Sequence, residues 1–236
     1  MAENVWVYRA DLKMLIGKEL YLHDEDGTHF PCDALFCGTG WMRQADLFHP
    51  EGIALELSLP YPENLEPWEM RKRWEKLVMD ADKEILQRFI ILREPPRHYR
   101  KRQNNTPYRL YRGMAPLNDD SILFMNHISV ANKLFAAEAQ AMWAVAYFGN
   151  EIKLPSHEGR SKEVAKCIAW CRRRYLSNGQ LGNCFVFDGV PYVDTLLDDM
   201  HLTAHRKKGF FKNFFAPVRP ADLGRAWQEY LQKVAS

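Results

Sequence analysis

The 236-residue sequence lacks the short motifs that usually mark catalytic or nucleotide-binding sites. It has no Gly-x-Ser-x-Gly nucleophile elbow and no glycine loop followed by Gly-Lys-Ser/Thr. The stretch CGTGW (37–41) contains Gly38-x-Gly40, but it lacks the third glycine and the helix-forming tail of a dinucleotide fingerprint. We therefore expect no catalytic residue and no cofactor, and whether the chain is an enzyme stays open, with binding favoured over catalysis.

Long apolar runs are also missing. A membrane-spanning helix needs about 18 or more uninterrupted apolar residues, and the richest stretch, 134–149, is broken by Glu138 and Gln140. The first residues, MAENVWVY, lack the basic and apolar regions of a signal peptide. We expect a soluble, reduced, cytoplasmic protein with no membrane partner.

Cysteines are few, and their spacing is unlike that of a zinc site. Two of the five form Cys32-x4-Cys37 and two form Cys167-x3-Cys171, whereas zinc knuckles use a two-residue spacing. We expect the second pair and Cys184 to be small buried side chains, and we expect no metal.

Two histidines, His201-x3-His205, could share one face of a helix and bind a metal. The glutamate that usually follows the first histidine of such a motif is replaced by Leu202. Surface residues or phosphate contacts are the favoured interpretation.

Hydrophobic periodicity predicts a protein of the α+β class, folded as a single domain over 1–236. Apolar side chains at three- and four-residue steps predict a helix over 66–92, and the alternation in GIALELSLP (52–60) predicts a half-buried strand. A ferredoxin-like, RNA-recognition-like core with added helices fits the order of elements, as do other arrangements. Further strands are expected at 4–10, 18–32 (a hairpin turning at Asp26-Gly27), 121–129 and 184–189, and further helices at 129–148, 161–176 (with Ser161 as N-cap), 190–202 and 219–234.

Charge is the feature that most favours a function. The net charge is only +2, yet basic residues gather after residue 96, in a loop or hairpin at about 96–113 and again in HLTAHRKKGFFKNFF (201–215). Lysine and arginine bind phosphate backbones, and aromatic faces stack on single-stranded bases for roughly 1–3 kcal/mol each. Ordinary solvated faces and core phenylalanines are the alternative. The candidate nucleic-acid-binding residues are Arg97, Tyr99, Arg100, Lys101, Arg102, Tyr108, Arg109, Arg112, His205, Arg206, Lys207, Lys208 and Lys212.

Three stretches resemble a CRISPR effector subunit that binds the 5′ end of the guide RNA in type I and type IV complexes. They are VPYVDTLLDDMHLTAHRKKGFF (190–211), HFPCDALF (29–36) and YRLYRGMAPL (108–117). Phe211 stands where that family usually has a second glycine. The resemblance implies an RNA-recognition fold that clamps RNA without chemistry, in a prokaryotic ribonucleoprotein complex of antiviral defence with RNA and other protein subunits as partners.

A second stretch, PYRLYRG (107–113), resembles the first motif of arginine-type ADP-ribosyltransferases. That resemblance implies that Arg112 holds the phosphates of NAD. The family's Ser-Thr-Ser is missing around Ser129, and no Glu-x-Glu follows downstream, which leaves Glu158 or Glu163 as substitutes.

The preferred hypothesis is therefore a subunit that binds RNA or single-stranded nucleic acid. An NAD-using transferase is the first alternative, and a phage or plasmid accessory protein acting through protein contacts is the second.

Overall fold

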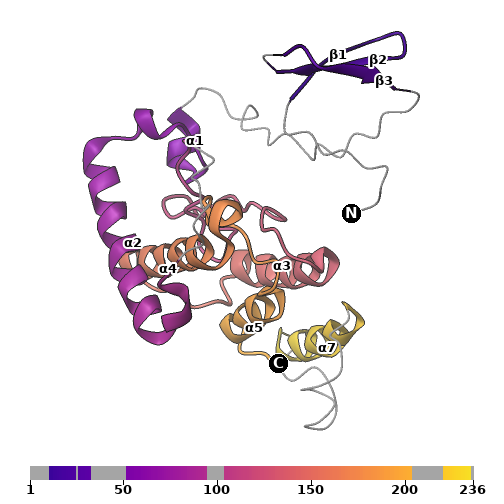
Figure 1. Ribbon diagram of the computed structural model, residues 1–236. Coiled ribbons are helices and arrows are strands. Elements are labelled where there is room, and N and C mark those ends of the chain that lie inside the picture. The colour runs from indigo at the N-terminus through magenta and orange to yellow at the C-terminus, as the bar shows by residue number, and fades with distance from the viewer. Residues whose placement is uncertain (1–10, 25, 33–51, 95–103, 204–219, 235–236) are drawn as a thin grey trace. The chain divides into compact units, whose positions relative to one another are not determined.

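The computed structural model of the protein describes residues 11–24, 26–32, 52–94, 104–203 and 220–234. The chain separates into two compact units, residues 1–43 and 44–236, which are described one at a time (Figure 1). The prediction of a single domain stays a prediction.

The first unit holds a small antiparallel sheet of three strands in the order β1-β2-β3. The strands are β1 (Asp11–Ile16), β2 (Glu19–His23) and β3 (His29–Pro31). Leu20 and Leu22 of β2 are buried, while the residues between and beside them are more exposed, as expected for a half-buried strand. The hairpin predicted over 18–32 is confirmed, and the strand predicted at 4–10 lies outside the described residues.

The second unit is helical. Its helices are α1 (Gly52–Glu56), α2 (Trp68–Arg88), α3 (Lys133–Phe148), α4 (His157–Tyr175), α5 (Gly189–Asp199) and α7 (Gly224–Val234). Short 3-10 turns lie at Glu63–Leu65, Ile90–Leu92, Leu176–Gly179 and Pro220–Leu223. α2 packs along α4, and α3 packs along α5 (Figure 1).

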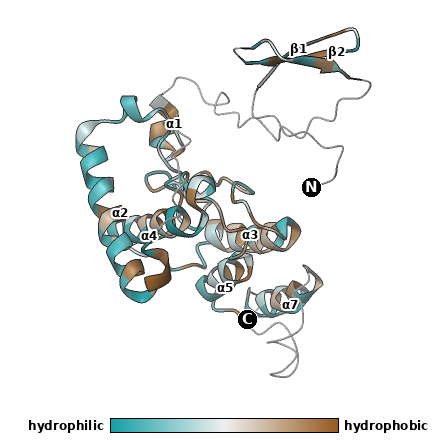
Figure 2. Cartoon of the chain, viewed as in Figure 1, coloured by the Kyte–Doolittle hydropathy of each residue, from teal (hydrophilic) through white to brown (hydrophobic). Residues whose placement is uncertain are grey.

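α3 lies at the centre of the main core. Trp143 and Ala139 of α3 are fully buried, as are Val193, Leu196 and Leu197 of α5. α2 is hydrophilic over most of its length, whereas α3 is more apolar (Figure 2). This difference follows from packing: α2 buries one stripe marked by Trp74, and α3 is covered on several sides.

One predicted strand is a helix. Residues 52–60 form α1 and a turn, in which the Leu57 amide donates to the Ile53 carbonyl and the Leu59 amide donates to the Ala54 carbonyl. A strand needs a partner strand for its backbone groups, whereas here the Leu57 and Leu59 amides are satisfied within the segment and the Ser58 carbonyl accepts from the Arg109 amide at 2.9 Å. The apolar residues that suggested a strand instead form a second small core with Leu110 and Phe124.

Two other predicted strands, at 121–129 and 184–189, meet only in a single parallel bridge between Ser129 and Cys184. All five expected helices are present, as α2, α3, α4, α5 and α7, with α4 starting earlier than predicted. The α+β class is confirmed, and the ferredoxin-like core is not. None of the described helices combines the length and apolar character needed to cross a membrane, and the cytoplasmic location stays a prediction.

Candidate functional site

One cavity of the helical unit lies against α4 and α5. Its volume is about 300 Å³, and segments 108–113, 127–128 and 182–188 complete its wall. Five aromatic side chains line it: Tyr108, His127, Trp170, Phe185 and Tyr192. Cavities of this kind, mostly apolar with a few polar groups, are the usual sites for small molecules.

A tight turn places Arg112 in the cavity wall. The Tyr111 amide donates to the Ala115 carbonyl at 2.7 Å, and Arg112 and Gly113 have φ values of +54° and +68°. A Cβ on Gly113 would lie 2.8 Å from Ile128 Cγ2, so this close approach requires glycine.

The Arg112 guanidinium is held by two carboxylates. Its Nε and Nη2 donate to the two Asp199 oxygens at 2.7 and 2.8 Å, and its Nη1 donates to Glu163 at 2.5 Å. Burial alone would lower the pKa of Arg112, but the hydrogen bonds and charge of Asp199 raise it overall. Arg112 is therefore a permanently charged residue whose charge is balanced inside the protein.

A second layer of hydrogen bonds fixes this arrangement. Trp143 Nε1 donates to Asp199 at 2.9 Å, and the Tyr192 hydroxyl donates to the Arg112 carbonyl at 2.9 Å. The buried Gln140 donates to the Tyr192 hydroxyl at 2.8 Å and accepts from the Asn126 amide at 3.0 Å. Both ends of the Gln140 amide are thus satisfied, which keeps the wall in one geometry.

Asp188, the carboxylate in the lining, is also balanced. It accepts hydrogen bonds from Trp170 Nε1 at 2.8 Å and the Tyr175 hydroxyl at 2.7 Å, and it forms an ion pair with Arg174 at 3.0 Å. The cavity is therefore lined by aromatic side chains and by two charged groups that are already paired.

Cys167 of α4 adds a thiol to the lining. Its side chain is accessible, yet it is surrounded by protein atoms, so its accessible surface faces the cavity. Burial raises the pKa of Cys167 to about 11, with the charge of Arg112 acting in the opposite direction. The prediction of a buried cysteine is wrong for Cys167 but confirmed for Cys171, whose thiol donates to the Cys184 carbonyl at 3.1 Å, and for Cys184.

Of the candidate nucleic-acid-binding residues, three are described. Tyr108 and Arg112 line the cavity, and Tyr108 is tilted against His127 with ring centroids 5.2 Å apart. Arg109 is buried and paired with Glu66 at 2.5 Å. The residues outside the described part are Arg97, Tyr99, Arg100, Lys101, Arg102, His205, Arg206, Lys207, Lys208 and Lys212.

His201 is exposed at the end of α5, as predicted, and His205 lies outside the described residues. Among the described residues, no three His, Cys, Asp or Glu side chains are grouped as metal ligands would be. The cavity residues His127, Trp170, Asp188 and Tyr192 were not predicted from the sequence. No known motif marks them, because they come together from three separate segments, with Asp188 and Tyr192 both at the start of α5.

The chain is similar to curated fungal proteins named FAD-dependent monooxygenases. It is 31% identical over 234 residues to rstn6 of Aspergillus nomiae NRRL, a match that covers 97% of this chain and 40% of that protein. It is 32% identical over 237 residues to DEP4 of Alternaria brassicicola, with 96% and 40% covered, and 31% identical over 204 residues to resA of Aspergillus sclerotiorum, with 84% and 35% covered. The chain thus spans about two fifths of the length of these relatives. No family model and no solved structure matches it.

These relatives overturn the functional prediction. The resemblances to a CRISPR subunit and to ADP-ribosyltransferases are wrong. The predicted role in RNA binding and antiviral defence is wrong as well, and so is the prediction that RNA and other complex subunits are the partners. The accessory-protein alternative has no support either. Part of the misleading signal has a physical explanation: the charges of Arg109 and Arg112 face carboxylates within the protein.

The described residues do not fit a whole FAD molecule. A dinucleotide's pyrophosphate is usually held at a glycine-rich turn between a parallel strand and a helix N-terminus. The described sheet is antiparallel throughout, and the arginine in the cavity wall is already paired with two carboxylates.

Proposed function

We propose that this chain forms part of an FAD-dependent monooxygenase and that the cavity beside Arg112 receives the organic substrate. The observation that carries the proposal is the 31–32% identity to enzymes of that name over 84–97% of the chain. FAD binding and oxygenation by the whole protein belong to the proposal.

The cavity wall supports an uncharged, largely apolar substrate. Trp170 and Phe185 offer aromatic faces, and Arg112 and Asp188 have no charge to spare for an ionic group. A charged ligand entering such a site would lose its hydration without gaining a partner, whereas an apolar one gains roughly 25 cal/mol for each Å² that it buries. This chain's own residues would therefore bind and orient the substrate and exclude water around it.

A chimaera tests the enzymatic part of the proposal. The residues of DEP4 that match this chain are replaced by the chain itself, and the purified protein is passed through gel filtration. We expect a folded chimaera that retains FAD, measured by its visible absorption, and that consumes oxygen when the flavin is reduced. A chimaera that folds, as judged by circular dichroism, but elutes without flavin would overturn the proposal.

A binding experiment tests the cavity separately. The neutral aromatic probe N-phenyl-1-naphthylamine is titrated into the chain, and its fluorescence and that of tryptophan are followed. Cys167→Phe fills the cavity and should weaken binding at least tenfold, while Cys167→Ala, which adds no volume, should leave it within twofold. Equal affinity for both variants would place the probe elsewhere.

A further inference from the structure

The backbone around Asn183 holds this residue in the wall of the cavity. The Ser129 amide donates to the Asn183 carbonyl, and the Phe185 amide donates to the Ser129 carbonyl, both at 2.8 Å. Successive side chains of an extended segment point to opposite sides. Asn183 and Phe185 line the cavity, whereas the buried Cys184 between them does not. The Asn183 side chain therefore lies on the cavity side of this segment.

The orientation of the Asn183 side-chain amide is fixed as well. Its Nδ2 donates to the His127 carbonyl at 2.9 Å. Because a carbonyl oxygen can only accept, the nitrogen must face His127, and Oδ1 takes the other branch of the amide. The preceding residue, Gly182, packs closely on α4, since a Cβ there would lie 2.8 Å from Ile168 Cγ1. This close contact keeps the segment in place.

The Oδ1 atom of Asn183 is an open acceptor. Only 4% of the residue is exposed, and Oδ1 accepts no hydrogen bond from any residue that the structure describes. It nevertheless retains accessible surface, in contrast to the enclosed Nε atoms of Arg109 and Arg160. Acceptors on buried residues are nearly always satisfied by protein, water or a ligand. An open acceptor on the cavity side of the wall therefore indicates a ligand that supplies a donor.

Three donors of the cavity lining are already used inside the protein. Trp170 Nε1 donates to Asp188 at 2.8 Å, and Thr195 Oγ1 donates to the Pro191 carbonyl at 2.9 Å. The Tyr192 hydroxyl donates to the backbone, as described above. A hydroxyl or N–H group of a ligand would thus meet an acceptor that these side chains leave unoccupied.

We propose that Asn183 makes this cavity selective for an uncharged substrate with a hydroxyl or N–H group, which donates to Oδ1. The apolar body of the substrate then lies against the aromatic faces of Trp170 and Phe185. A cationic donor is disfavoured, because the Arg112 guanidinium lies in the same wall and a buried charge needs a charged partner. The inference rests on the proposed function, since it takes the cavity as the substrate site.

Two ligands that differ in a single methyl group test the inference on the unmodified chain. 1-Naphthol donates a hydrogen bond and is uncharged at pH 7, whereas 1-methoxynaphthalene keeps the oxygen but cannot donate. The methyl group of the ether would by itself strengthen binding, because it adds apolar surface. We expect calorimetric titration to show 1-naphthol binding about fivefold more tightly, which is the usual net strength of one hydrogen bond.

Asn183→Leu removes the acceptor and keeps the approximate size of the side chain. We expect the preference for 1-naphthol to disappear, while the affinity for 1-methoxynaphthalene stays within about twofold of its value for the unmodified chain. Thr195→Val is the matched control, because it removes a lining hydroxyl whose hydrogen is already donated within the protein, and it should keep the preference. A folded Asn183→Leu variant that still prefers 1-naphthol would overturn the inference.

Asn183→Leu also leaves the His127 carbonyl without its donor and can therefore fail to fold. Cys167→Ala gives a second test, because it widens the cavity and leaves Asn183 unchanged. If a hydrogen bond sets the preference, the preference stays at about fivefold in this variant. If the bulk of the methyl group sets it, the preference shrinks in the wider cavity, and that result would contradict the inference.

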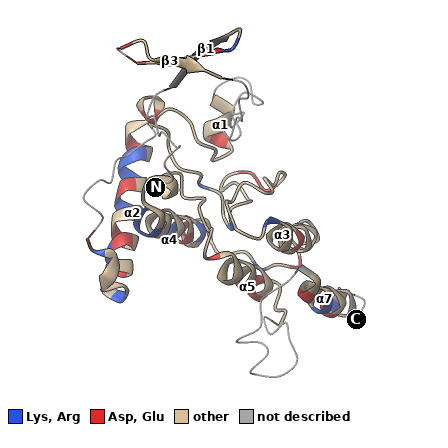
Figure 3. Cartoon of the chain, turned by 45° about the vertical axis from the view of Figure 1, so that its right-hand side comes forward, with Lys and Arg blue, Asp and Glu red and all other residues tan. Residues whose placement is uncertain are grey.

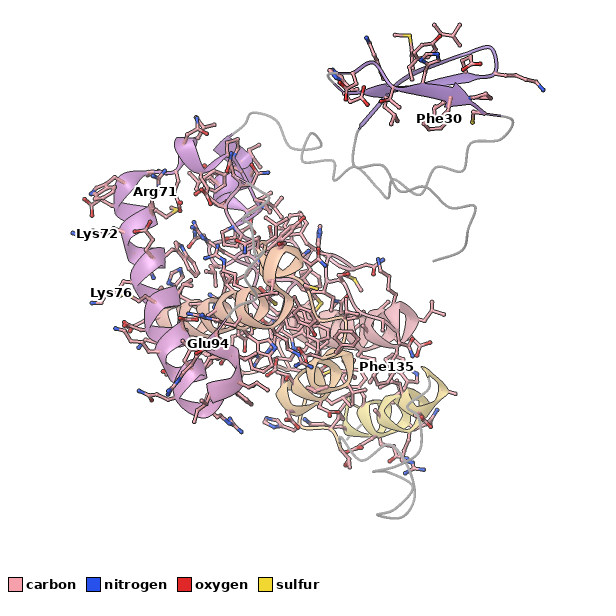
Figure 4. All side chains as sticks on the ribbon, in the orientation of Figure 1. Phe30, Arg71, Lys72, Lys76, Glu94 and Phe135 are labelled. Carbon is pink, nitrogen blue, oxygen red and sulfur yellow. The ribbon has the colours of Figure 1, made fainter. Side chains whose placement is uncertain are left out.

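Lys76→Gln controls for binding outside the cavity. Both signs of charge alternate along α2 (Figure 3), and Lys72 and Lys76 point away from the rest of the helical unit (Figure 4). Such a hydrated face offers little apolar surface to a naphthalene ring. The affinities for both ligands should therefore be unchanged in this variant.

The outcomes separate this inference from the proposed function. Cys167→Phe, which fills the cavity, should weaken the binding of both ligands about tenfold or more. If both ligands bind in the cavity and the ether binds as tightly as 1-naphthol, the selectivity of Asn183 is overturned and the substrate cavity stands. If neither ligand binds, or if Cys167→Phe leaves both affinities unchanged, the cavity is not the binding site and that part of the proposed function is overturned too.

Discussion

Asp199 holds Arg112 in a two-point ion pair, with Oδ2 2.7 Å from Nε and Oδ1 2.8 Å from Nη2. The two side chains are only 13% and 15% exposed. The pair joins the end of α5 to the turn at 111–115 and so fixes one wall of the cavity. Because Trp143 also donates to Asp199, the carboxylate links three elements of the second unit.

Asp199→Asn should destabilise the helical unit by about 3 kcal/mol, because it removes the two-point carboxylate partner of a buried guanidinium and leaves the half-exposed Glu163 as its remaining carboxylate. The free energy of unfolding is measured in urea. Asp198→Asn is the control, since Asp198 is the exposed neighbour of Asp199 on α5. A loss of under about 1 kcal/mol for Asp199→Asn would mean that Glu163 alone suffices to hold Arg112.

Gly179→Ala should prevent the turn after α4 from packing as it does. A Cβ on Gly179 would lie 1.8 Å from the Cys171 carbonyl oxygen, a backbone atom that no side-chain rotation can move away. We expect a loss of about 3 kcal/mol or more, seen as a lower midpoint in thermal unfolding. Gly224→Ala at the start of α7 is the control, because nothing lies within 4 Å of a Cβ there, and it should be neutral or stabilising by up to about 1 kcal/mol.

The thiol of Cys167 should react slowly at neutral pH. Burial raises its pKa to about 11, so at pH 7.5 it holds roughly 300-fold less thiolate than an ordinary thiol of pKa about 8.5. The greater nucleophilicity of a more basic thiolate offsets part of this, leaving a rate roughly 20-fold lower. The rate should rise steadily with pH until about 11, because each unit below the pKa removes nine tenths of the thiolate.

The measurement is the rate of reaction with 4,4′-dithiodipyridine between pH 7 and 9.5, resolved by peptide mass spectrometry and compared with glutathione. If the reaction rate of Cys167 stopped rising with pH below pH 9, this result would contradict its raised pKa. The neutral probe of the cavity should protect this cysteine, and a thiol equally reactive with and without the probe would place the probe outside the cavity.

The helices were predictable because each carries a periodic apolar stripe that a single sequence displays. The 66–92 stripe, for example, became α2, with Trp74, Ala81 and Ile85 buried. The 52–60 prediction failed because five to nine residues of alternating apolar character fit a strand or a short helix equally well. What decided between them was the contact with Leu110 and Phe124, which are distant in sequence.

The site was harder to predict than the helices for the same reason. Arginines in a sequence look alike whether they face water or a carboxylate, and Glu66 lies 43 residues from Arg109, while Asp199 lies 87 residues from Arg112. Local charge density therefore overstated the basic surface. The proposed function rests on the similarity to longer fungal proteins, and no local motif in this chain displays that similarity.

The first residue of α4 differs between the sequence-based prediction and the structure. Ser161 was the predicted N-cap, but the cap is Ser156, whose hydroxyl accepts from the Gly159 amide at 3.2 Å. Ser161 lies inside the helix, fully buried, and its hydroxyl donates to the His157 carbonyl at 2.9 Å.

Ser156→Ala should therefore cost about 1 kcal/mol, because it exposes an amide that nothing else in the helix can satisfy. Ser161→Ala should change stability by no more than about 0.5 kcal/mol, since the His157 carbonyl keeps its place in the helical ladder and alanine is the better helix former. Urea unfolding of the two variants side by side decides between the two starting points. If Ser161→Ala lowers the free energy of unfolding more than Ser156→Ala does, then α4 begins at Ser161, as the sequence predicted.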